Sequence, residues 1–525
     1  MARDLARLSF ESGRQLGLLL SRDGRVEMVL VGEPESMLIP DLPKSREGRG
    51  RLRGLRFIHT HLNDGHLSRD DVMDLILLRL DLVGSIRVDD HGGATTLEIA
   101  HILPANGADQ QGWQVMEPVP CFRPDVDFLQ LVQSLEDELE RNRSTSTTLH
   151  RKERAILVSV SDMDRRTATE SMEELAELAY TSGITVADRI IQRQRNINPK
   201  YLIGKGKLSE ISLRALQLGV DLLIFNQELN PSQVRAITDT TELRVIDRTQ
   251  LILDIFAQRA RSREGKIQVE MAQLKYLLPR LGVRDDALSR LTGGIGARGP
   301  GETKLEIDRR RIKDRIAHLG RDLGKIRKSR GQRRSLRLRK GLPLISIVGY
   351  TNAGKSTLLN TLTKSEIFVG KQHFATLDPT SRRLRFPRDF EVIIADTVGF
   401  IKDLPGELLD AFAATLEELQ DADLLLHVVD ASDPRFDEHI EAVQCILTKL
   451  DLQQKPVIMV FNKMDLADSA TLDNSLMRYG GVAVCALSTN SLEPLILSME
   501  DHVQMLVAQE DYEPTDSRMQ ERDFI

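Results

Sequence analysis

Residues 349–357, Gly-Tyr-Thr-Asn-Ala-Gly-Lys-Ser-Thr, have the types and spacing of a phosphate-binding loop. The apolar run 344–348 precedes them and a helical pattern follows, which is the strand–loop–helix context that this motif requires. Backbone N–H groups in such a loop, with a helix N-terminus behind them, bind phosphate oxygens. Lys355 would place its charge on the β- and γ-phosphates, and the Ser356 hydroxyl would bind Mg²⁺. The loop predicts a purine nucleoside triphosphate without choosing between ATP and GTP. Its predicted binding residues are Gly349, Tyr350, Thr351, Asn352, Ala353, Gly354, Lys355, Ser356 and Thr357.

A second segment, Asn-Lys-Met-Asp at 462–465, follows a predicted strand over 456–461 and indicates guanine as the base. The Asp465 carboxylate can accept from both guanine N1–H and the exocyclic amine, a pair of donors that adenine lacks. We expect Asn462 at the far edge of the base and the Lys463 stem over its face. The predicted residues are Asn462, Lys463, Met464 and Asp465.

About twenty residues further on, Cys-Ala-Leu at 485–487 follows a predicted strand over 482–484. We expect the backbone N–H of Ala486 to meet guanine O6. Cys485 stands where a serine is usual, but a backbone contact survives that change. The segment adds Cys485, Ala486 and Leu487 to the predicted site, which is therefore built for GTP.

Between these segments lie the predicted sensors of the γ-phosphate. Asp396 ends a predicted strand over 392–395 and would hold Mg²⁺ through a water, while the Gly399 N–H would contact the γ-phosphate. Thr376 is the candidate second protein ligand of Mg²⁺, along with Ser356, and fits the spacing better than other nearby threonines. These segments comprise Phe374, Ala375, Thr376, Leu377, Asp378, Asp396, Thr397, Val398 and Gly399. The predicted catalytic residues are Lys355, Thr376, Asp396 and Gly399.

Phe400 departs from the pattern of many GTPases, which carry a glutamine after this glycine to orient the attacking water. An aromatic side chain cannot do so. We therefore expect slow intrinsic hydrolysis until a partner, a second conformation or a monovalent cation completes the site. An asparagine at the position of Asn352 occurs in K⁺-stimulated GTPases, which makes K⁺ a candidate cofactor besides Mg²⁺.

These segments need a scaffold, and 525 residues suffice for several domains. We predict an α/β fold whose GTPase domain has a mostly parallel, doubly wound sheet, preceded by a small α/β domain with a long antiparallel helical hairpin and an extra N-terminal α+β domain. A polar stretch over 141–148 reads as a linker. The expected divisions are 1–140, 152–262, 263–341 for the hairpin, 342–505 for the GTPase domain and 506–525 for an acidic, disordered tail.

The hairpin is predicted from two heptad-like seams that flank a glycine-rich stretch over 293–301. Pro279 should kink or interrupt the first helix. Between residues 303 and 340 the chain carries 16 Lys/Arg against 4 Asp/Glu, although its formal net charge is −6. Such a basic segment indicates a nucleic-acid partner, while the plainer alternative is a solvated helix face. The seams are Ile267, Met271, Leu274, Leu278 and Leu281, and Ile312, Ile316, Leu319, Leu323 and Ile326.

With these segments in order, residues 152–500 resemble the HflX family of ribosome-associated GTPases. The resemblance implies binding to the large ribosomal subunit through its rRNA, and GTP-dependent dissociation or rescue of stalled ribosomes. The alternative is an rRNA-bound assembly or regulatory scaffold with incidental turnover. Some family members are credited with ATP binding by the first α/β domain, where 204–207 is a candidate contact, although a plain turn or an RNA contact fits better.

Residues 1–140 lie outside this resemblance. His59, His61 and Asp71 weakly resemble the zinc site of JAMM-type (RadC-like) domains, but the spacing is one residue short and Leu62 replaces a proline. Glu27, Glu33 and Glu35 could each serve as the base, so none is identified. We therefore expect no Zn²⁺ here.

The three scattered cysteines, the absence of an apolar run long enough to span a bilayer, and an N-terminus unlike a signal peptide predict a cytoplasmic protein. We expect a monomer without membrane insertion, with guanine nucleotides and the large ribosomal subunit as partners.

Overall fold

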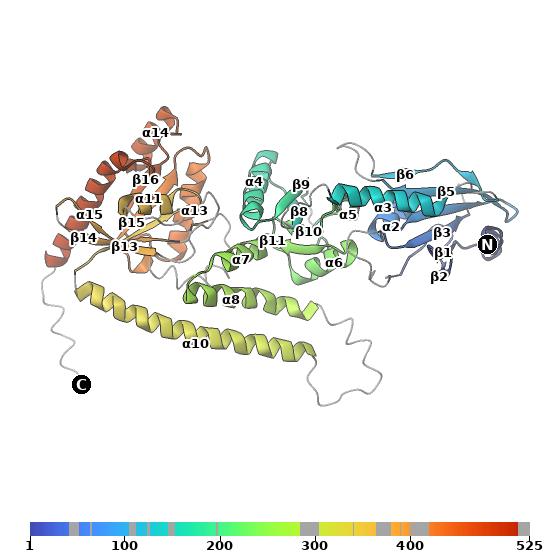
Figure 1. Cartoon of the computed structure of the whole chain (residues 1–525), viewed down its shortest axis with the longest axis horizontal. Helices are drawn as coiled ribbons and strands as arrows, with labels where there is room; N and C mark the ends of the chain where they lie inside the picture. Colours follow the sequence, from blue (N-terminus) through green and yellow to red (C-terminus); the bar gives the residue numbers. More distant parts are fainter. Residues whose placement is uncertain are drawn as a thin grey trace. The chain divides into compact units, whose positions relative to one another are not determined.

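The computed structural model describes residues 1–40, 42, 52–62, 66–103, 112–122, 127–144, 153–195, 198–283, 304–339, 341–363, 380–388, 390–397, 399–400 and 419–512. The chain divides into two compact units, Met1–Arg248 and Thr249–Ile525 (Figure 1). Among the described residues, no helix has both the length and the apolar composition needed to cross a bilayer.

The first unit begins with a mixed sheet of order β2-β1-β3-β4-β5-β6, with β7 paired to β5. Strands β3 and β4 run parallel and the other pairs antiparallel. Strands β1 and β2 form an antiparallel hairpin. The elements are α1 (Ala2–Ser12), β1 (Leu16–Ser21), β2 (Val26–Val31), β3 (Leu55–His61), α2 (Arg69–Leu77), β4 (Leu82–Val88), β5 (Ala94–Ile102), β6 (Trp113–Val115), β7 (Val119–Pro120) and α3 (Phe128–Ser144).

The second sheet of this unit is parallel throughout, with order β11-β10-β8-β9, in agreement with the predicted small α/β domain. Helix α5 also packs on the first sheet's domain, because Leu213 and Leu216 belong to its core. The 204–207 segment forms the start of α5, where Lys207 pairs with Glu210 at 2.8 Å. The elements are β8 (Arg154–Ser161), α4 (Arg165–Thr181), β9 (Thr185–Arg193), α5 (Lys205–Leu218), β10 (Leu222–Phe225), α6 (Pro231–Thr241) and β11 (Arg244–Asp247). Helix α7 (Arg248–Arg259) begins at the last residue of this unit and belongs otherwise to the second.

In the second unit, the predicted hairpin is formed by α8 (Arg263–Leu277) and α10 (Lys304–Arg339), which lie side by side in Figure 1. Ile267, Leu319 and Leu323 form their shared core, as the seams predicted. Arg315 of α10 forms an ion pair with Glu270 of α8. Asp322, seven residues later in α10, interacts electrostatically with Arg263, seven residues earlier in α8. The two helices therefore run antiparallel. Before Pro279 the α-helix gives way to a 3₁₀ segment, η1 (Leu278–Val283), as predicted. The glycine-rich stretch over 293–301 lies outside the described residues.

The GTPase domain has a six-stranded sheet of order β13-β14-β12-β15-β16-β17, in which only the β13–β14 pair is antiparallel. Strand β12 is buried along its whole length, as expected for a strand covered on both faces. The elements are β12 (Leu344–Gly349), α11 (Lys355–Thr363), β13 (Thr380–Arg385), β14 (Glu391–Asp396), β15 (Leu424–Asp430), α13 (Phe436–Lys449), β16 (Val457–Asn462), α14 (Ser469–Tyr479), β17 (Val482–Ala483), η2 (Thr489–Leu492) and α15 (Glu493–Tyr512).

Two predicted boundaries need correction. Helix α3 continues to Ser144, so the linker predicted over 141–148 begins inside a helix. Helix α15 continues to Tyr512, so the tail predicted from 506 also begins inside a helix. Met499 and Val503 are fully buried in the domain core. Because their burial anchors α15, the helix continues into a segment whose composition is polar. Residues 513–525 lie outside the described part of the chain.

Candidate functional site

The phosphate loop links β12 to α11 by a backbone that needs unusual dihedral angles. Gly349, Asn352 and Gly354 have φ of +151°, +64° and +94°, respectively. A Cβ on Gly349 would lie 2.2 Å from the carbonyl oxygen of Val428, so only glycine fits beside β15.

Lys355 lies inside this loop with its side chain almost fully buried. Its ammonium donates hydrogen bonds to the carbonyl oxygens of Gly349 at 3.0 Å and Tyr350 at 2.6 Å. Burial lowers the pKa of Lys355 to about 8, although the charge of Asp396 opposes this shift. A Cβ on Gly399 would lie 3.0 Å from the ammonium, so Lys355 and the predicted γ-phosphate sensor are neighbours. A bound phosphate would offer Lys355 a charged acceptor in place of two carbonyl groups.

Ser356 and Asp396 supply oxygen atoms that fit Mg²⁺. The Ser356 hydroxyl, at the start of α11, donates to the Asp396 carboxylate at the end of β14 over 2.6 Å. Mg²⁺ prefers such hard oxygen ligands and keeps several waters. The predicted ligand Thr376, with the rest of 374–378, lies outside the described residues, as does Val398.

Asn462 bridges two loops that were expected to contact the nucleotide. Its amide N–H₂ donates to the carbonyl oxygen of Ala353 at 2.8 Å, and its amide oxygen accepts from the Ala486 N–H at 2.9 Å. The side chain is buried, and Gly354 leaves room for it, because a Cβ there would lie 2.2 Å from Nδ2. This bridging role was not predicted. The contact of the Ala486 N–H with guanine O6 stays a prediction. It requires this N–H to donate to both the Asn462 amide oxygen and O6, or to leave the first acceptor for the second.

Replacing Asn462 by alanine is expected to leave the Ala353 carbonyl and the Ala486 N–H buried without this partner. Each such group costs about 1–3 kcal/mol, so the free energy of unfolding should fall by roughly 2–6 kcal/mol. Chemical unfolding of the variant would measure this loss, with the exposed Asn474→Ala as control. Equal stability of the two variants would contradict the bridging role.

The remaining base-binding candidates lie at the carboxyl end of β16. The Lys463 ammonium pairs with Asp430 at 2.5 Å, and Asp430 also accepts from the Ser432 hydroxyl at 2.6 Å. Asp465 is exposed and able to accept from a base. Asp430 was not predicted from the sequence, although its position at the end of an apolar strand next to β16 could have indicated a site residue.

Not every predicted side chain is directed at a nucleotide. Thr397 donates from its hydroxyl to the Ile347 carbonyl at 2.6 Å, which ties β14 to β12. The Tyr350 ring stacks on His439 with centroids 3.9 Å apart. The Cys485 N–H donates to the Ser491 hydroxyl at 3.0 Å. These residues shape the loops, and Met464 and Leu487 are exposed.

Phe400 is buried in the fold, at 2% exposure. Its N–H donates to the Gly349 carbonyl at 3.1 Å, and its carbonyl oxygen accepts from the Thr351 N–H at 2.8 Å. The backbone therefore fastens the loop after β14 to the phosphate loop. The ring has no polar atom with which to orient a water, as the sequence predicted.

His427, in the middle of β15, is a buried residue that the sequence reading missed. Burial lowers its pKa to about 4, and the nearby positive charge of Lys355 acts in the same direction. His427 is thus neutral at physiological pH, and its protonation opposes folding.

This shift predicts acid sensitivity of the GTPase domain. As pH falls from about 6.5 to about 4, the unfolded chain binds the His427 proton before the folded chain does, so stability is lost at roughly 1.4 kcal/mol per pH unit. A His427→Gln variant should lose less stability than the wild type between about pH 7 and about pH 5. Urea unfolding, monitored by the hydrogen exchange of β15 amides, measures the difference in stability. The control variant is His502→Gln. Parallel pH profiles of wild type and His427→Gln would refute this assignment.

Together, the buried lysine within a glycine loop, the serine–aspartate pair and the exposed aspartate after β16 define a P-loop GTPase. Three family models match the chain in succession: "GTP-binding GTPase N-terminal" over residues 169–257, "GTP-binding GTPase Middle Region" over 259–337, and "50S ribosome-binding GTPase" over 344–463. The chain belongs to the HflX GTPase family and hydrolyses GTP, as predicted.

Among its relatives, "GTPase HflX" of Caldanaerobacter subterraneus subsp. tengcongensis is 49% identical over 324 residues, covering 62% of this chain and 75% of the relative. "GTPase HflX" of Escherichia coli is 45% identical over 319 residues, covering 60% and 74%. A solved GTP-binding protein of Sulfolobus solfataricus in complex with GDP is 26% identical and covers 68% of this chain and 100% of that chain, with a TM-score of 0.38. That low score adds no argument to the sequence matches.

Proposed function

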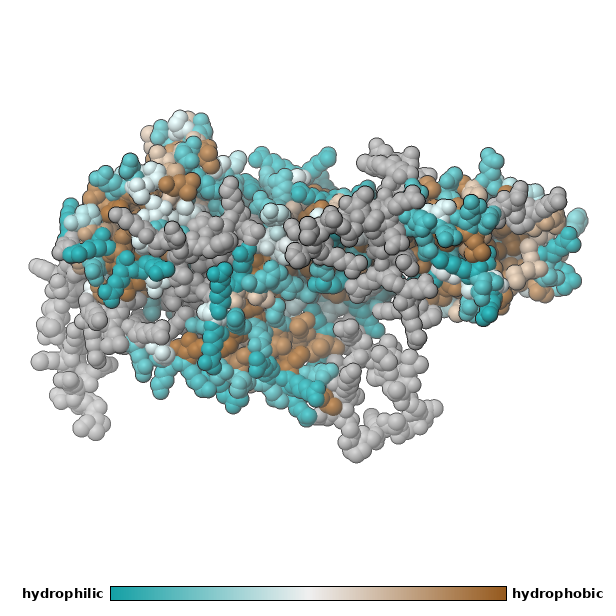
Figure 2. Space-filling view, in the orientation of Figure 1, coloured by the Kyte–Doolittle hydropathy of each residue, from teal (hydrophilic) through white to brown (hydrophobic). Residues whose placement is uncertain are grey.

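We propose that this protein binds the large ribosomal subunit and couples GTP hydrolysis to dissociation of stalled or idle ribosomes. One observation carries the proposal: a long basic helix, α10, leads directly into the GTPase domain. Figure 2 shows hydrophilic residues along the outer side of this helix and apolar residues toward α8. Arg309, Lys313 and Arg321 are exposed, so they are available to backbone phosphates. The family model that matches residues 344–463, "50S ribosome-binding GTPase", supports the same partner.

In the proposed reaction, the loop N–H groups and Lys355 hold the triphosphate, and Asp465 selects guanine. When bound, Mg²⁺ would neutralise negative charge on the β- and γ-phosphates, held by Ser356 directly and by Asp396 through water. Thr376 is the proposed second protein ligand of Mg²⁺. The Gly399 N–H senses the γ-phosphate beside Lys355.

The proposed catalyst is incomplete without its partner, because the buried Phe400 ring cannot orient the attacking water. The ribosome would complete it, with K⁺ near Asn352 as a further candidate stimulant. Asn352 is exposed in the left-handed conformation, so its side chain is open to ligands. An unchanged GTPase rate on exchange of Na⁺ for K⁺ would remove the K⁺ part of the proposal.

The role of α10 is tested by removing two of its exposed charges. The double variant Arg309→Gln, Lys313→Gln should bind large subunits more weakly, with a salt dependence reduced by about 0.7–0.9 per lost phosphate contact. The matched control carries Lys449→Gln and Arg478→Gln, on α13 and α14. Equal subunit affinity of the two double variants, measured by cosedimentation over a salt series, would contradict RNA binding by α10.

Ribosome dissociation separates the proposal from its alternative, an rRNA-bound scaffold with incidental turnover. The buried Phe400 keeps that alternative open, since a slow catalyst can serve as a switch. Sucrose gradients of ribosomes incubated with the protein and GTP should show conversion to subunits, and a Lys355→Ala variant should not convert them. Subunit binding without any conversion would favour the scaffold.

A further inference from the structure

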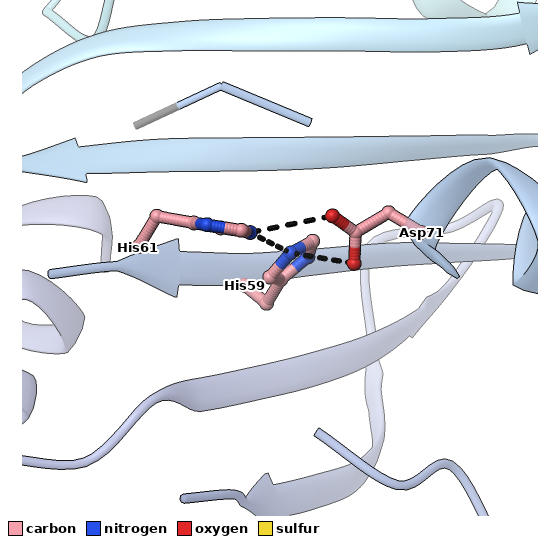
Figure 3. Close-up of side chains that lie close together, drawn as sticks. All are labelled: His59, His61 and Asp71. Carbon is pink, nitrogen blue, oxygen red and sulfur yellow. Dashed lines mark hydrogen bonds and ion pairs between the residues drawn. The ribbon is translucent and has the colours of Figure 1, made fainter. Parts of the chain in front are cut away.

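Three side chains of the first sheet's domain converge where β3 meets the start of α2 (Figure 3). His59 and His61 project from the same face of β3, because they are two residues apart on a strand. Their Nε2 atoms lie 2.8 Å apart. Asp71 of α2 places its two carboxylate oxygens 3.1 Å from His59 Nε2 and 3.3 Å from His61 Nε2.

While the Asp71 carboxylate is ionised, hydrogen bonds alone cannot satisfy all three contacts. An imidazole Nε2 either carries a proton and donates, or lacks it and accepts. With Asp71 ionised, its contacts with His59 and His61 need a proton on each Nε2. Two such N–H groups would then face each other across 2.8 Å. Removing either proton leaves a lone pair facing the carboxylate instead. One contact is always repulsive, whereas a single central cation would attract all three lone pairs.

The spacing of the three groups is close to that of a coordination shell. Tetrahedral Zn²⁺ has bonds of about 2.0–2.2 Å to histidine nitrogen and carboxylate oxygen, which separates neighbouring ligand atoms by roughly 3.3–3.5 Å. The two histidine nitrogens lie 2.8 Å apart, and the distances of 3.1 and 3.3 Å each join one histidine to a different oxygen of Asp71. Side-chain movements would therefore place both nitrogens and one or both carboxylate oxygens around a single ion.

The surrounding residues hold the ligands in position. Ser68 donates to the Asp71 carboxylate from both its N–H and its hydroxyl, each at 2.7 Å, in the capping box that starts α2. The ring of His59 stacks on Phe57 with centroids 4.7 Å apart.

We propose that His59, His61 and Asp71 bind one divalent transition-metal ion, with Zn²⁺ as the expected occupant. Two histidines and a carboxylate suit Zn²⁺, which binds more tightly than Fe²⁺ in the usual affinity order. Three protein ligands leave a fourth position for water. The expectation of no zinc rested on the spacing of these residues along the chain. The proposal replaces it, because α2 brings Asp71 to the two histidines although that spacing is one residue short. It stops at metal binding, since Glu27, Glu33 and Glu35 are all exposed and none is marked as a base.

The test uses the full chain, freed of metal by a chelator and titrated with Zn²⁺. Calorimetry and metal analysis should give one Zn²⁺ per chain for the wild type. His61→Ala and Asp71→Asn should each weaken this binding by more than about 100-fold, because even loss of a residue that only orients a ligand costs 10–100-fold. The controls are the neighbouring exposed residues, His66→Ala and Asp70→Asn, which should bind as the wild type does.

Trp113, the single tryptophan, lies in β6 of the same sheet and reports where the metal binds. Zn²⁺ should raise the midpoint of the Trp113 fluorescence unfolding curve in the wild type and controls, but not in His61→Ala or Asp71→Asn. An unchanged GTPase rate would show that the GTPase domain of each variant is folded.

Two results would overturn the proposal: a wild type that takes up neither Zn²⁺ nor Fe²⁺ stoichiometrically, or His61→Ala and Asp71→Asn variants that bind as the controls do. An anaerobic Fe²⁺ titration decides the metal, and tighter binding of Fe²⁺ than Zn²⁺ would refute Zn²⁺ as the occupant. None of these measurements depends on the ribosome.

Discussion

Replacing Lys355 by alanine is expected to lower the GTPase rate by about 10²–10³-fold, the usual cost of removing one preorganised group that stabilises transition-state charge. The Lys355 ammonium is already held inside the phosphate loop by two carbonyl groups and lies beside Gly399. The methyl group of alanine cannot replace the positive charge that Lys355 would place beside the β- and γ-phosphates. Single-turnover hydrolysis of GTP measures the loss.

The matched control for this variant is Lys449→Ala, an exposed lysine in the last turn of α13. It should hydrolyse GTP at the wild-type rate. Because Lys355 is buried, the unfolding curve of each variant should accompany the kinetics. A folded Lys355→Ala variant with the control's rate would show that the loop does not hold the reacting phosphates.

Replacing Asp465 by asparagine is expected to exchange the base that the site prefers. The carboxylate accepts two guanine donors, and a site built for such a pair discriminates by roughly 10⁴–10⁵-fold against a base that lacks them. Asparagine would present an N–H₂ donor, which suits the 2-oxo group of xanthine and opposes the guanine amine. The ratio of GTP to xanthosine triphosphate affinity should therefore invert.

Competition binding with both nucleotides measures this ratio, and Asp473→Asn on α14 provides an exposed control that should retain GTP preference. An Asp465→Asn variant that still prefers GTP would place the base elsewhere. Loss of binding to both nucleotides would instead indicate damage to the 462–465 segment. Because Asn462 of this segment hydrogen-bonds both Ala353 and Ala486, such damage should also lower the stability measured by the unfolding curve.

The sequence predicts most of the strands that carry the site, because buried parallel strands are short apolar runs that end in polar residues. Strands β12, β14 and β16 each begin and end within one residue of their predicted bounds. Helix ends were less predictable. The burial of Met499 and Val503 extends α15 through a segment whose composition alone reads as a tail.

The site was predictable where one segment carries a whole chemical function, as the phosphate loop does. It was not predictable where function depends on pairs distant in sequence. The salt bridge of Lys463 with Asp430 joins β15 and β16, and Asn462 reaches Ala353 across 109 positions. The same limit applied to His59 and Asp71, whose proximity depends on how α2 packs beside β3.

The most direct test of the ribosome-coupled account is the steady-state GTPase rate of the full chain, with and without purified large ribosomal subunits. We predict stimulation of at least about tenfold, since partner-supplied groups complete other GTPase sites with larger effects, and no stimulation of Lys355→Ala. An equal rate with and without large subunits, at concentrations where cosedimentation shows binding, would contradict the account.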